Sequence, residues 1–505
     1  MIKQLDNSEH LMSLRHAEWP ENPKDAKRLF SRRKPLRKML VMIDGDLMAD
    51  RRADGKLDKR LVLTSLLSHE LVECFRYADR GPSKDIKPLV ISKVPPPYPV
   101  YAGWVMAHPF SDGHWPVTYS PQEGEYVNAS VTGMGPQMAR EDNSVQAYPD
   151  LSSEDRAVKR EMDALALDVA SQALQADLFI TERPYLYSGS RWARQDGVTV
   201  CTPDEAITIV ALYLRTQGQF VLPSEHEAVK SSFNEGLYFW VGARELLPEG
   251  WRWFSSCVHH SSGLGDDKLM LLGGSLLSRV TKALQARDDV HAVLNLRSNN
   301  DTNDSALGSL DTVLVLLMGA VDVSARVAHY VLQLPARQEY SAAWQKQSWR
   351  QQVAATAPVL AAIADTGTSG EHTLTILRLL RNSVHGAALQ GVSVLEDRKQ
   401  EMLVGLPASD EADLLAAMDA MGGRDSWGFR QLIPGRSHVE PAVLVDKLFE
   451  TVVELLNALM KETPVERLAH VTVTVEDSGP PAPEHGRMDT FSEWNRLAIR
   501  WQLGL

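Results

Sequence analysis

Cysteine is scarce in this sequence of 505 residues. The three cysteines, Cys74, Cys201 and Cys257, are too few and too scattered to build a disulfide framework. None belongs to a C-x-x-C pair, so a structural zinc site made of thiolates is not expected. This usage favours a protein that folds inside the cell.

Long apolar runs are also missing. No stretch approaches the roughly 18–20 apolar residues that cross a membrane. The strongest run, Val313 to Val321, is expected to belong to a core helix. The first residues, MIKQLDNSEHLMSLRHAEW, contain no apolar segment of a secretory signal. We therefore expect a cytoplasmic protein with no membrane partner.

Positive charge is not in excess. The 53 Lys and Arg residues stand against 65 Asp and Glu, giving a net charge of −12, so any nucleic-acid binding must use a local patch. Residues 24–38 are one candidate, because eight of the fifteen are Lys or Arg. The alternative for this segment is a solvated basic arm. The balance of 44% hydrophobic and 23% charged residues is that of a folded protein and excludes a disordered chain.

Strand and helix patterns alternate in the first half of the chain. The run MLVMIDGDL, residues 39–47, predicts a buried strand, and residues 61–79 carry apolar side chains at helical spacing. A helix over 154–175 leads to a strand at 176–181. This alternation is typical of a parallel sheet with helices on both faces.

One more strand and helix are predicted over residues 197–217. The helix is capped by Thr202 or Asp204, with Pro203 near its first turn. Residues 89–150 are rich in Pro, Gly, Ser and Tyr, and they predict loops with short strands. We interpret them as an insertion within the first domain.

The chain is expected to divide into an α/β domain (1–225), an all-α domain (226–470) and a C-terminal extension (471–505). Strand signals become rare after about residue 225. Near the extension, residues 468–477 predict a strand and Phe491 to Trp501 a helix. Helices of the all-α domain are predicted over 226–245, 269–287, 304–334, 338–364, 371–385, 409–421 and 441–462.

Acidic residues fall at predicted strand ends and on the facing helices of the α/β domain. Open parallel sheets bind ligands at the carboxyl ends of their strands. Carboxylates gathered in a dry pocket do not all ionise unless a cation joins them. Mg²⁺ or Mn²⁺ prefers such oxygen ligands and could activate water for phosphodiester hydrolysis. The alternative is that these acids lie on solvated helix faces. The candidates are Asp44, Asp46, Glu70, Asp163, Asp168, Asp177 and Glu182.

Together with MLVMIDGDL, the run DALALDVASQALQADLFITERPYL resembles PIN-like nuclease domains. In that family an Asp ends the first strand, a second acid lies on an early helix, and a third starts the helix before a later strand. The resemblance covers roughly residues 39–220. It matches Asp44 to the first acid, Glu70 to the second and Asp163 to the third. It implies a PIN-like parallel-sheet sandwich with Mg²⁺ or Mn²⁺ among these acids.

Two further positions of the PIN-like pattern have competing candidates. Asp168 competes with Asp163 for the third acid and for a place among the metal ligands. The later strand of the family ends in Thr-x-acid or Thr-x-Asn. Glu182 follows Thr181 one residue too early for that spacing, and Asp177 is the other candidate.

A second group of chemistry-bearing residues lies in GEHTLTILRLLRNSVHGAAL, residues 370–389. Arg381 and His385 are four residues apart, so both are expected on one helix face, with Gly386 after the helix end. An Arg fixes a phosphate by a forked contact, and a His moves the proton of a 2′-hydroxyl or of a leaving oxygen. The alternative is an ordinary surface Arg and a His near a helix end.

The order Leu-Arg-Asn-x-x-His-Gly on a late helix of an all-α domain resembles the HEPN family. The signature there is Arg, often followed by Asn, Asp or His, and then a His, here Arg381, Asn382 and His385. The resemblance covers about residues 225–465 and implies a helical bundle. Members are commonly metal-independent ribonucleases of bacterial toxin and anti-phage systems. They usually form homodimers in which two motifs make one composite site.

Two smaller clusters contain residue types that bind metals or bases. Cys257, His259 and His260 suggest a metal but lack a second pair of ligands. In the segment 89–150, three polar residues lie beside two aromatic ones, which predicts either a base-stacking surface or a packed loop. These five are His108, Asp112, His114, Phe110 and Trp115.

The sequence therefore predicts an RNA-cleaving nuclease, and the HEPN resemblance implies a toxin or anti-phage effector with a partner protein or antitoxin. Its expected site residues are Arg381, Asn382 and His385 in the second domain, and the carboxylates led by Asp44 and Asp163 in the first. One alternative is an inactive regulatory or scaffold protein that binds nucleic acid or a partner. Another is a DNA nuclease that acts through the acids alone.

Overall fold

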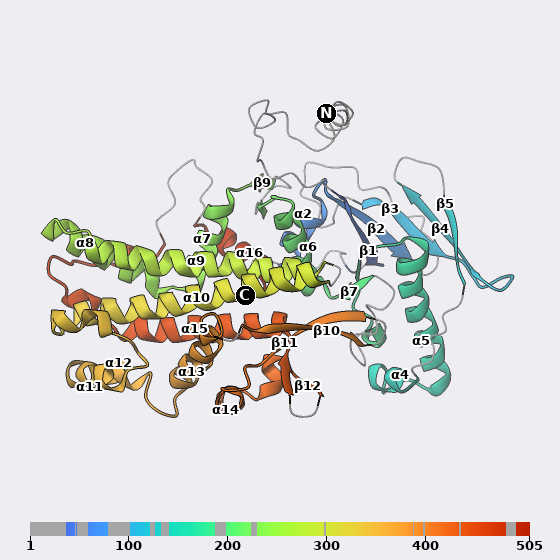
Figure 1. The fold of residues 1–505 in the computed structure, drawn as a ribbon. Helices are drawn as coiled ribbons and strands as arrows, with labels where there is room; N and C mark the ends of the chain where they lie inside the picture. Colours follow the sequence, from blue (N-terminus) through green and yellow to red (C-terminus); the bar gives the residue numbers. More distant parts are fainter. Residues whose placement is uncertain are drawn as a thin grey trace, which may run out of the picture. The chain divides into compact units, whose positions relative to one another are not determined.

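The chain divides into two compact units in the computed structural model (Figure 1). The first unit ends at Ser232 and the second begins at Phe233, close to the boundary expected at 225/226. The first is α/β and the second is mainly helical, which confirms the α/β class and the helical character of the second half. The second unit is not all-α, because it contains a four-stranded sheet. The structure describes residues 37–45, 47, 59–78, 101–121, 127–132, 141–186, 198–223, 230–296, 299–386, 388–396, 399–433, 436–480 and 491–505.

A mixed sheet forms the centre of the first unit. Seven strands of the described part pair in the order β5-β4-β3-β2-β1-β6-β7. Strands β3, β2, β1, β6 and β7 run parallel, whereas β4 and β5 are antiparallel. The bounds are β1 Met39–Asp44, β2 Val72–Ala78, β3 Tyr101–Ala107, β4 Trp115–Pro121, β5 Val127–Val131, β6 Leu178–Ile180 and β7 Thr199–Cys201.

The buried centre of this sheet follows from its apolar strands. Val41, Met42 and Ile43 of β1 have no exposed surface, as expected for a parallel strand covered on both faces. Helices flank the sheet: α2 Lys59–Leu67, α4 Glu141–Ala147, α5 Ser153–Asp168 and α6 Pro203–Thr216. The predicted start of α6 is confirmed, because Thr202 and Glu205 form a capping box and Pro203 opens the first turn. A small hairpin, β8 Val221–Pro223 and β9 Lys230–Ser232, ends the unit.

The helix predicted over residues 61–79 is wrong in its second half. Helix α2 ends at Leu67, and β2 begins at Val72. Between them the backbone turns, with the amide of Val72 donating to the carbonyl of His69 at 2.9 Å. The run VECFRYA is rich in aromatic and β-branched residues and mostly alternates between buried and half-buried positions, which suits a strand. The lateral partners β1 and β3 decide the outcome.

The segment 89–150 contributes strands to the main sheet. In its described part, β3 pairs in parallel with β2, and the antiparallel strands β4 and β5 extend the sheet. Short strands were expected here. Their place in the same sheet makes this segment part of the first unit's framework.

The second unit is built around long helices (Figure 1). Helices α9, α10 and α15 pack against one another, and α15 has the bounds predicted for it, 441–462. Helix α16 belongs to the same unit, since the hydroxyl of Tyr238 donates to Gln502 at 3.2 Å. The helix bounds are α7 Glu235–Leu246, α8 Glu249–Leu264, α9 Lys268–Leu294, α10 Asn300–Val331, α11 Gln347–Thr356, α12 Pro358–Ala362, α13 Ser369–Asn382, α14 Glu411–Ala420, α15 Pro441–Glu462 and α16 Glu493–Gln502.

Helix α10 is long and apolar enough, by length and composition, to cross a membrane. Half of its most apolar window is buried inside the unit. Val313, Leu317 and Val321 have no exposed surface, which agrees with the core helix predicted for Val313 to Val321. The core helix of a soluble protein passes the same test of length and composition.

Several local predictions for the second unit are wrong. A four-stranded sheet follows α13, with the order β10-β11-β13-β12, and was not predicted. Residues 468–477 form no strand, because they pack beside α8, where the Ala469 carbonyl bonds His260 Nδ1 at 2.8 Å. The helix predicted over 338–364 is not continuous, since α11 begins at Gln347 and ends before Pro358. The helix predicted over 226–245 begins only at Glu235, after β9. The new strands are β10 Gln390–Glu396, β11 Lys399–Gly405, β12 Phe429–Ile433 and β13 Arg436–Val439.

Candidate functional site

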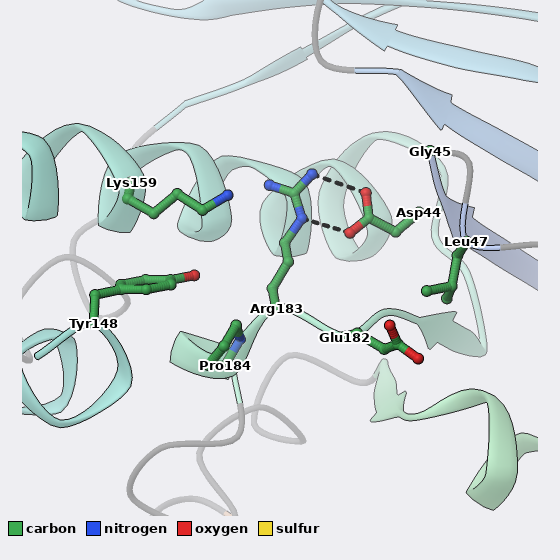
Figure 2. Close-up of a pocket in the computed structure, with 8 residues that line it drawn as sticks. All are labelled: Asp44, Gly45, Leu47, Tyr148, Lys159, Glu182, Arg183 and Pro184. Carbon is green, nitrogen blue, oxygen red and sulfur yellow. Dashed lines mark hydrogen bonds and ion pairs between the residues drawn. The ribbon is translucent and has the colours of Figure 1, made fainter. Parts of the chain in front are cut away.

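A cavity of about 300 Å³ lies at the carboxyl ends of β1 and β6 (Figure 2). The chain proceeds from β1 to β2 on one side and places β6 on the other, so this point is the topological switch of the parallel strands. Doubly wound sheets bind ligands at such points. The cavity is lined by Asp44, Gly45, Leu47, Tyr148, Lys159, Glu182, Arg183 and Pro184.

Asp44 stands at the end of β1, where the chain turns sharply away from the sheet. Gly45 takes a φ of 43° there, a left-handed conformation that glycine adopts without strain. Its carbonyl accepts a hydrogen bond from Arg76 Nε at 3.0 Å. This turn leaves the Asp44 carboxylate at the edge of the cavity, with its side chain 15% exposed.

The guanidinium of Arg183 donates two hydrogen bonds to this carboxylate (Figure 2). Nε donates to Asp44 Oδ2 at 2.6 Å and Nη2 donates to Oδ1 at 2.8 Å. Thr181 Oγ1 donates to Oδ2 at 2.8 Å. Both oxygens of Asp44 are therefore engaged by residues that follow β6.

The same guanidinium also reaches Asp163 on α5. Arg183 Nη1 lies 3.1 Å from Asp163 Oδ1, and Lys159 Nζ lies 3.7 Å from that oxygen. The hydroxyl of Tyr148 donates to Oδ2. The Asp163 side chain has no exposed surface, and this burial raises the pKa of its carboxyl against the opposing effects of Tyr148, Arg183 and Lys159. Arg183 thus joins Asp44 and Asp163, which come from two separate elements.

The predicted carboxylates only partly converge. Asp44 and Asp163 meet through Arg183, but Glu70 is an exposed residue of the turn before β2, at the opposite edge of the sheet. Its expected place on a helix beside Asp44 is wrong because α2 ends at Leu67. Asp168 is fully buried at the end of α5 and is not part of the cavity lining.

The other acids of the first unit have different surroundings. Asp177 precedes β6, at the far edge from the cavity, and accepts a hydrogen bond from the Leu40 amide at 2.9 Å. Glu182 lines the cavity and lies 3.7 Å from Arg60 Nη2. Asp46 falls outside the described residues.

The cavity residues that the sequence reasoning missed are Tyr148, Lys159 and Arg183. A signal for Arg183 was available. The PIN-like pattern asks for an acid or Asn two residues after the strand's Thr, and the residue two after Thr181 is Arg183. A cation stands where the resemblance predicts an oxygen ligand.

These residues do not fit a divalent metal as they stand. No group of three or more His, Cys, Asp or Glu side chains placed to hold a metal occurs in the described part of the chain. Asp44 and Asp163 carry two negative charges, and Arg183 and Lys159 supply two positive charges. Metal ligation by Asp44 and Asp163 stays a prediction and requires Arg183 to leave.

The Arg381–His385 segment lies at the end of α13 in the second unit. The helix ends at Asn382, so the expected placement of Arg381 and His385 on one continuous helix face is wrong. His385 follows in a turn, its amide donating to the Asn382 carbonyl at 3.1 Å. Gly386 does not take the left-handed conformation expected after the helix, and the cap residue is Ser383 in a right-handed conformation. Asn382 and His385 are exposed, and Arg381 is half-buried.

Arg381 belongs to a group of cations around Asp322 of α10. Burial raises the pKa of Asp322, and the charges of Arg326, Arg381, Arg279 and Lys346 oppose that rise. Arg326 lies one turn along the same helix. Arg279 reaches across from α9 and packs against Gly319, where an added Cβ would lie 2.1 Å from its Nη1.

This group, the Asp322 cluster, is positively charged. The cations named with Asp322 give an excess of three positive charges. Arg381 Nε is buried, and no described residue accepts a hydrogen bond from it. The cations around Asp322 therefore favour the binding of an anion near Arg381.

The smaller clusters give little support for a site. On α8, Cys257 is fully buried, which raises the pKa of its thiol to about 12, and His260 bonds the Ala469 carbonyl. Between β3 and β4, Phe110 is 59% exposed and its ring lies 5.5 Å from that of Trp115. A base-stacking role there stays a prediction.

Comparisons with protein-family models, with curated proteins and with solved structures find no match for this chain.

Proposed function

We propose that the protein is a metal-independent endoribonuclease whose chemistry lies at the end of α13. The observation that supports this best is the Asp322 cluster, whose Arg381 comes shortly before the exposed Asn382 and His385 in the sequence. A phosphodiester brings a negative charge that this cluster lacks. Because the whole chain is acidic, a local cluster of this kind is needed for binding RNA.

The proposed roles follow from side-chain chemistry. Arg381 donates to the phosphate, with its guanidinium oriented by packing at the helix end. His385 accepts the proton of the 2′-hydroxyl as the 2′-oxygen bonds to phosphorus, or it protonates the 5′-oxygen as the P–O bond breaks. Imidazoles titrate near neutral pH and suit either role. A single turn supplies one such His, and a second copy of the chain would supply the other.

Self-association is therefore part of the proposal. The HEPN resemblance implies paired motifs, and a two-fold pair is the commonest assembly of soluble proteins. A role as a toxin or anti-phage effector, held by a partner protein or antitoxin, is the biological setting that the same resemblance suggests. It needs a test in cells that express the chain alone.

The main alternative is an inactive scaffold or regulatory protein. The ion pairs of Arg183 with Asp44 and Asp163 favour an inactive first unit, because both carboxylates are already paired. The metal-dependent alternative, with Mg²⁺ or Mn²⁺ at Asp44 and Asp163, is favoured by their convergence at the switch point. The two alternatives predict opposite responses to metal.

The test uses the purified full chain with total RNA and with DNA, with and without EDTA. The proposal predicts RNA cleavage that EDTA does not inhibit. His385→Ala should abolish it, whereas His372→Ala should not, because His372 lies on the same helix beside Glu371 and away from the turn. Cleavage that requires metal would move the activity to the first unit. Full activity of His385→Ala would refute the assigned site.

A further inference from the structure

The pairing of Asp44 with Asp163 through one guanidinium has a second consequence. Asp44 lines the switch-point cavity, and Asp163 lies buried next to it. Two neighbouring carboxyl groups are both ionised only if a cation compensates them. In nucleases that use acids, this cation is a divalent metal. In this chain the atoms between the two carboxylates belong to Arg183.

We propose that Arg183 is a built-in cation that replaces a divalent metal in the first unit, and that removing its guanidinium opens a Mn²⁺ or Mg²⁺ site between Asp44 and Asp163. Asp44 and Asp163 of the first unit then form an acid site that Arg183 closes to metal ions. This inference does not depend on the cleavage site proposed for the second unit.

The geometry of the guanidinium supports this role. Each of its three nitrogens donates to a carboxylate oxygen, at 2.6, 2.8 and 3.1 Å. Its planar fork matches Asp44, and its third nitrogen, Nη1, reaches Asp163. Lysine would offer one charged nitrogen and could not bridge the two carboxylates in this way.

The surroundings hold the guanidinium in place. The carbon Cζ of Arg183 lies 5.6 Å from the centre of the Tyr77 ring, a cation–π distance. The backbone amide of Arg183 donates to Thr181 Oγ1 at 3.2 Å, and its side chain is only 9% exposed. An ion from solvent must displace a buried group that already satisfies both carboxylates.

Charge balance leads to the same conclusion. Arg183 and Lys159 neutralise Asp44 and Asp163, and the third carboxylate of the cavity, Glu182, lies 3.7 Å from Arg60 Nη2. A divalent ion added to this set would leave two uncompensated positive charges. Removing Arg183 leaves one excess negative charge. It also leaves the two oxygens of Asp44 without their strongest hydrogen-bond donor. Carboxylate oxygens are the ligands that Mg²⁺ and Mn²⁺ prefer.

The test measures Mn²⁺ binding to the full chain by electron paramagnetic resonance and by thermal melting. Wild type should show no Mn²⁺ signal that depends on Asp44. Arg183→Ala should melt lower in EDTA, bind Mn²⁺ and recover stability with it, and Asp44→Asn added to Arg183→Ala should remove that binding. Lys159→Ala is the matched control, because it removes a cation from the same cavity but keeps the bridge, and it should bind no Mn²⁺.

Two results would overturn the inference. One is Mn²⁺ binding by wild type that Asp44→Asn abolishes, since Arg183 would then not replace the metal. The other is a folded Arg183→Ala that binds no Mn²⁺. If Arg183→Ala does not fold, Arg183→Gln serves in its place, because glutamine keeps donors without charge, and the wild-type titration stands on its own.

Discussion

Replacing Arg183 with methionine should destabilise the first unit strongly. The variant keeps much of the apolar stem but removes the charge between Asp44 and Asp163, and both side chains are largely buried. Breaking a buried ion pair by removing one partner costs about 3–5 kcal/mol. At about 2–4 °C per kcal/mol for a unit of this size, the melting temperature at neutral pH should fall by roughly 6–20 °C.

The pH dependence gives this prediction a clear sign. Burial already raises the pKa of Asp163 in the folded protein, and the loss of Arg183 removes a charge that holds it down. A carboxyl whose folded pKa exceeds its unfolded value destabilises the fold as pH rises from the unfolded value through the folded one. The difference in melting temperature between wild type and Arg183→Met should therefore be smallest near the unfolded aspartate pKa, about 3.9, and largest at neutral pH.

Differential scanning calorimetry in EDTA at several pH values measures both effects. Lys159→Met is the control, because its side chain is 44% exposed and its nitrogen lies 3.7 Å from Asp163. A partly exposed pair of this kind contributes about 0–1 kcal/mol. If Arg183→Met melts no lower than Lys159→Met, or if its deficit grows toward acidic pH, the bridge does not have the role argued for it.

Further predictions concern other parts of the chain. His385→Ala should lose RNA cleavage by about 10²–10⁴, as expected for a lost proton-transfer group, with the fold intact. Arg381→Lys should also lose cleavage, because lysine cannot make the forked contact to a phosphate; full activity would place the phosphate contact elsewhere. Arg244→Met should melt at the wild-type temperature or higher. Burial lowers the pKa of Arg244 to about 10, and no described residue accepts a hydrogen bond from its Nε or Nη1. A clearly lower melting temperature would show that its stacking on Trp240 dominates. Thr202→Ala should cost about 1 kcal/mol in chemical denaturation through loss of the α6 capping box, and an unchanged midpoint would contradict that. Light scattering at micromolar concentration should find a dimer, and a strict monomer would count against a composite active site.

Local sequence patterns were enough to predict much of the architecture. The apolar run before Asp44, the cap at Thr202 and the helical period over 441–462 each predicted an element that the structure contains. These signals depend on neighbours within a few residues, so they can be recognised in the sequence alone. The sequence predicted that Asp44, Glu70 and Asp163 converge at the carboxyl edge of the parallel sheet. Asp44 and Asp163 meet through Arg183, whereas Glu70 lies at the opposite edge.

Elements that depend on partners distant in the sequence could not be predicted from local patterns. The run VECFRYA continues a helical pattern, yet it becomes β2 because β1 and β3 supply its hydrogen bonds. This moves Glu70 to the edge opposite Asp44. The small sheet β10–β13 pairs strands separated by the helix α14, and α13 ends at Asn382 although its apolar period continues to Val384.

The sequence by itself determined the α/β class of the first unit, the helical character of the second, their approximate boundary and which acids and cations were available. Only the tertiary structure decided that Arg183, which lies 139 residues from Asp44, joins Asp44 to Asp163. It also gathered Arg381 with cations of α9 and α10 around Asp322. The physical reason is that Coulomb interactions and hydrogen bonds act over a few ångströms, whatever the separation along the chain, and folding alone sets those distances.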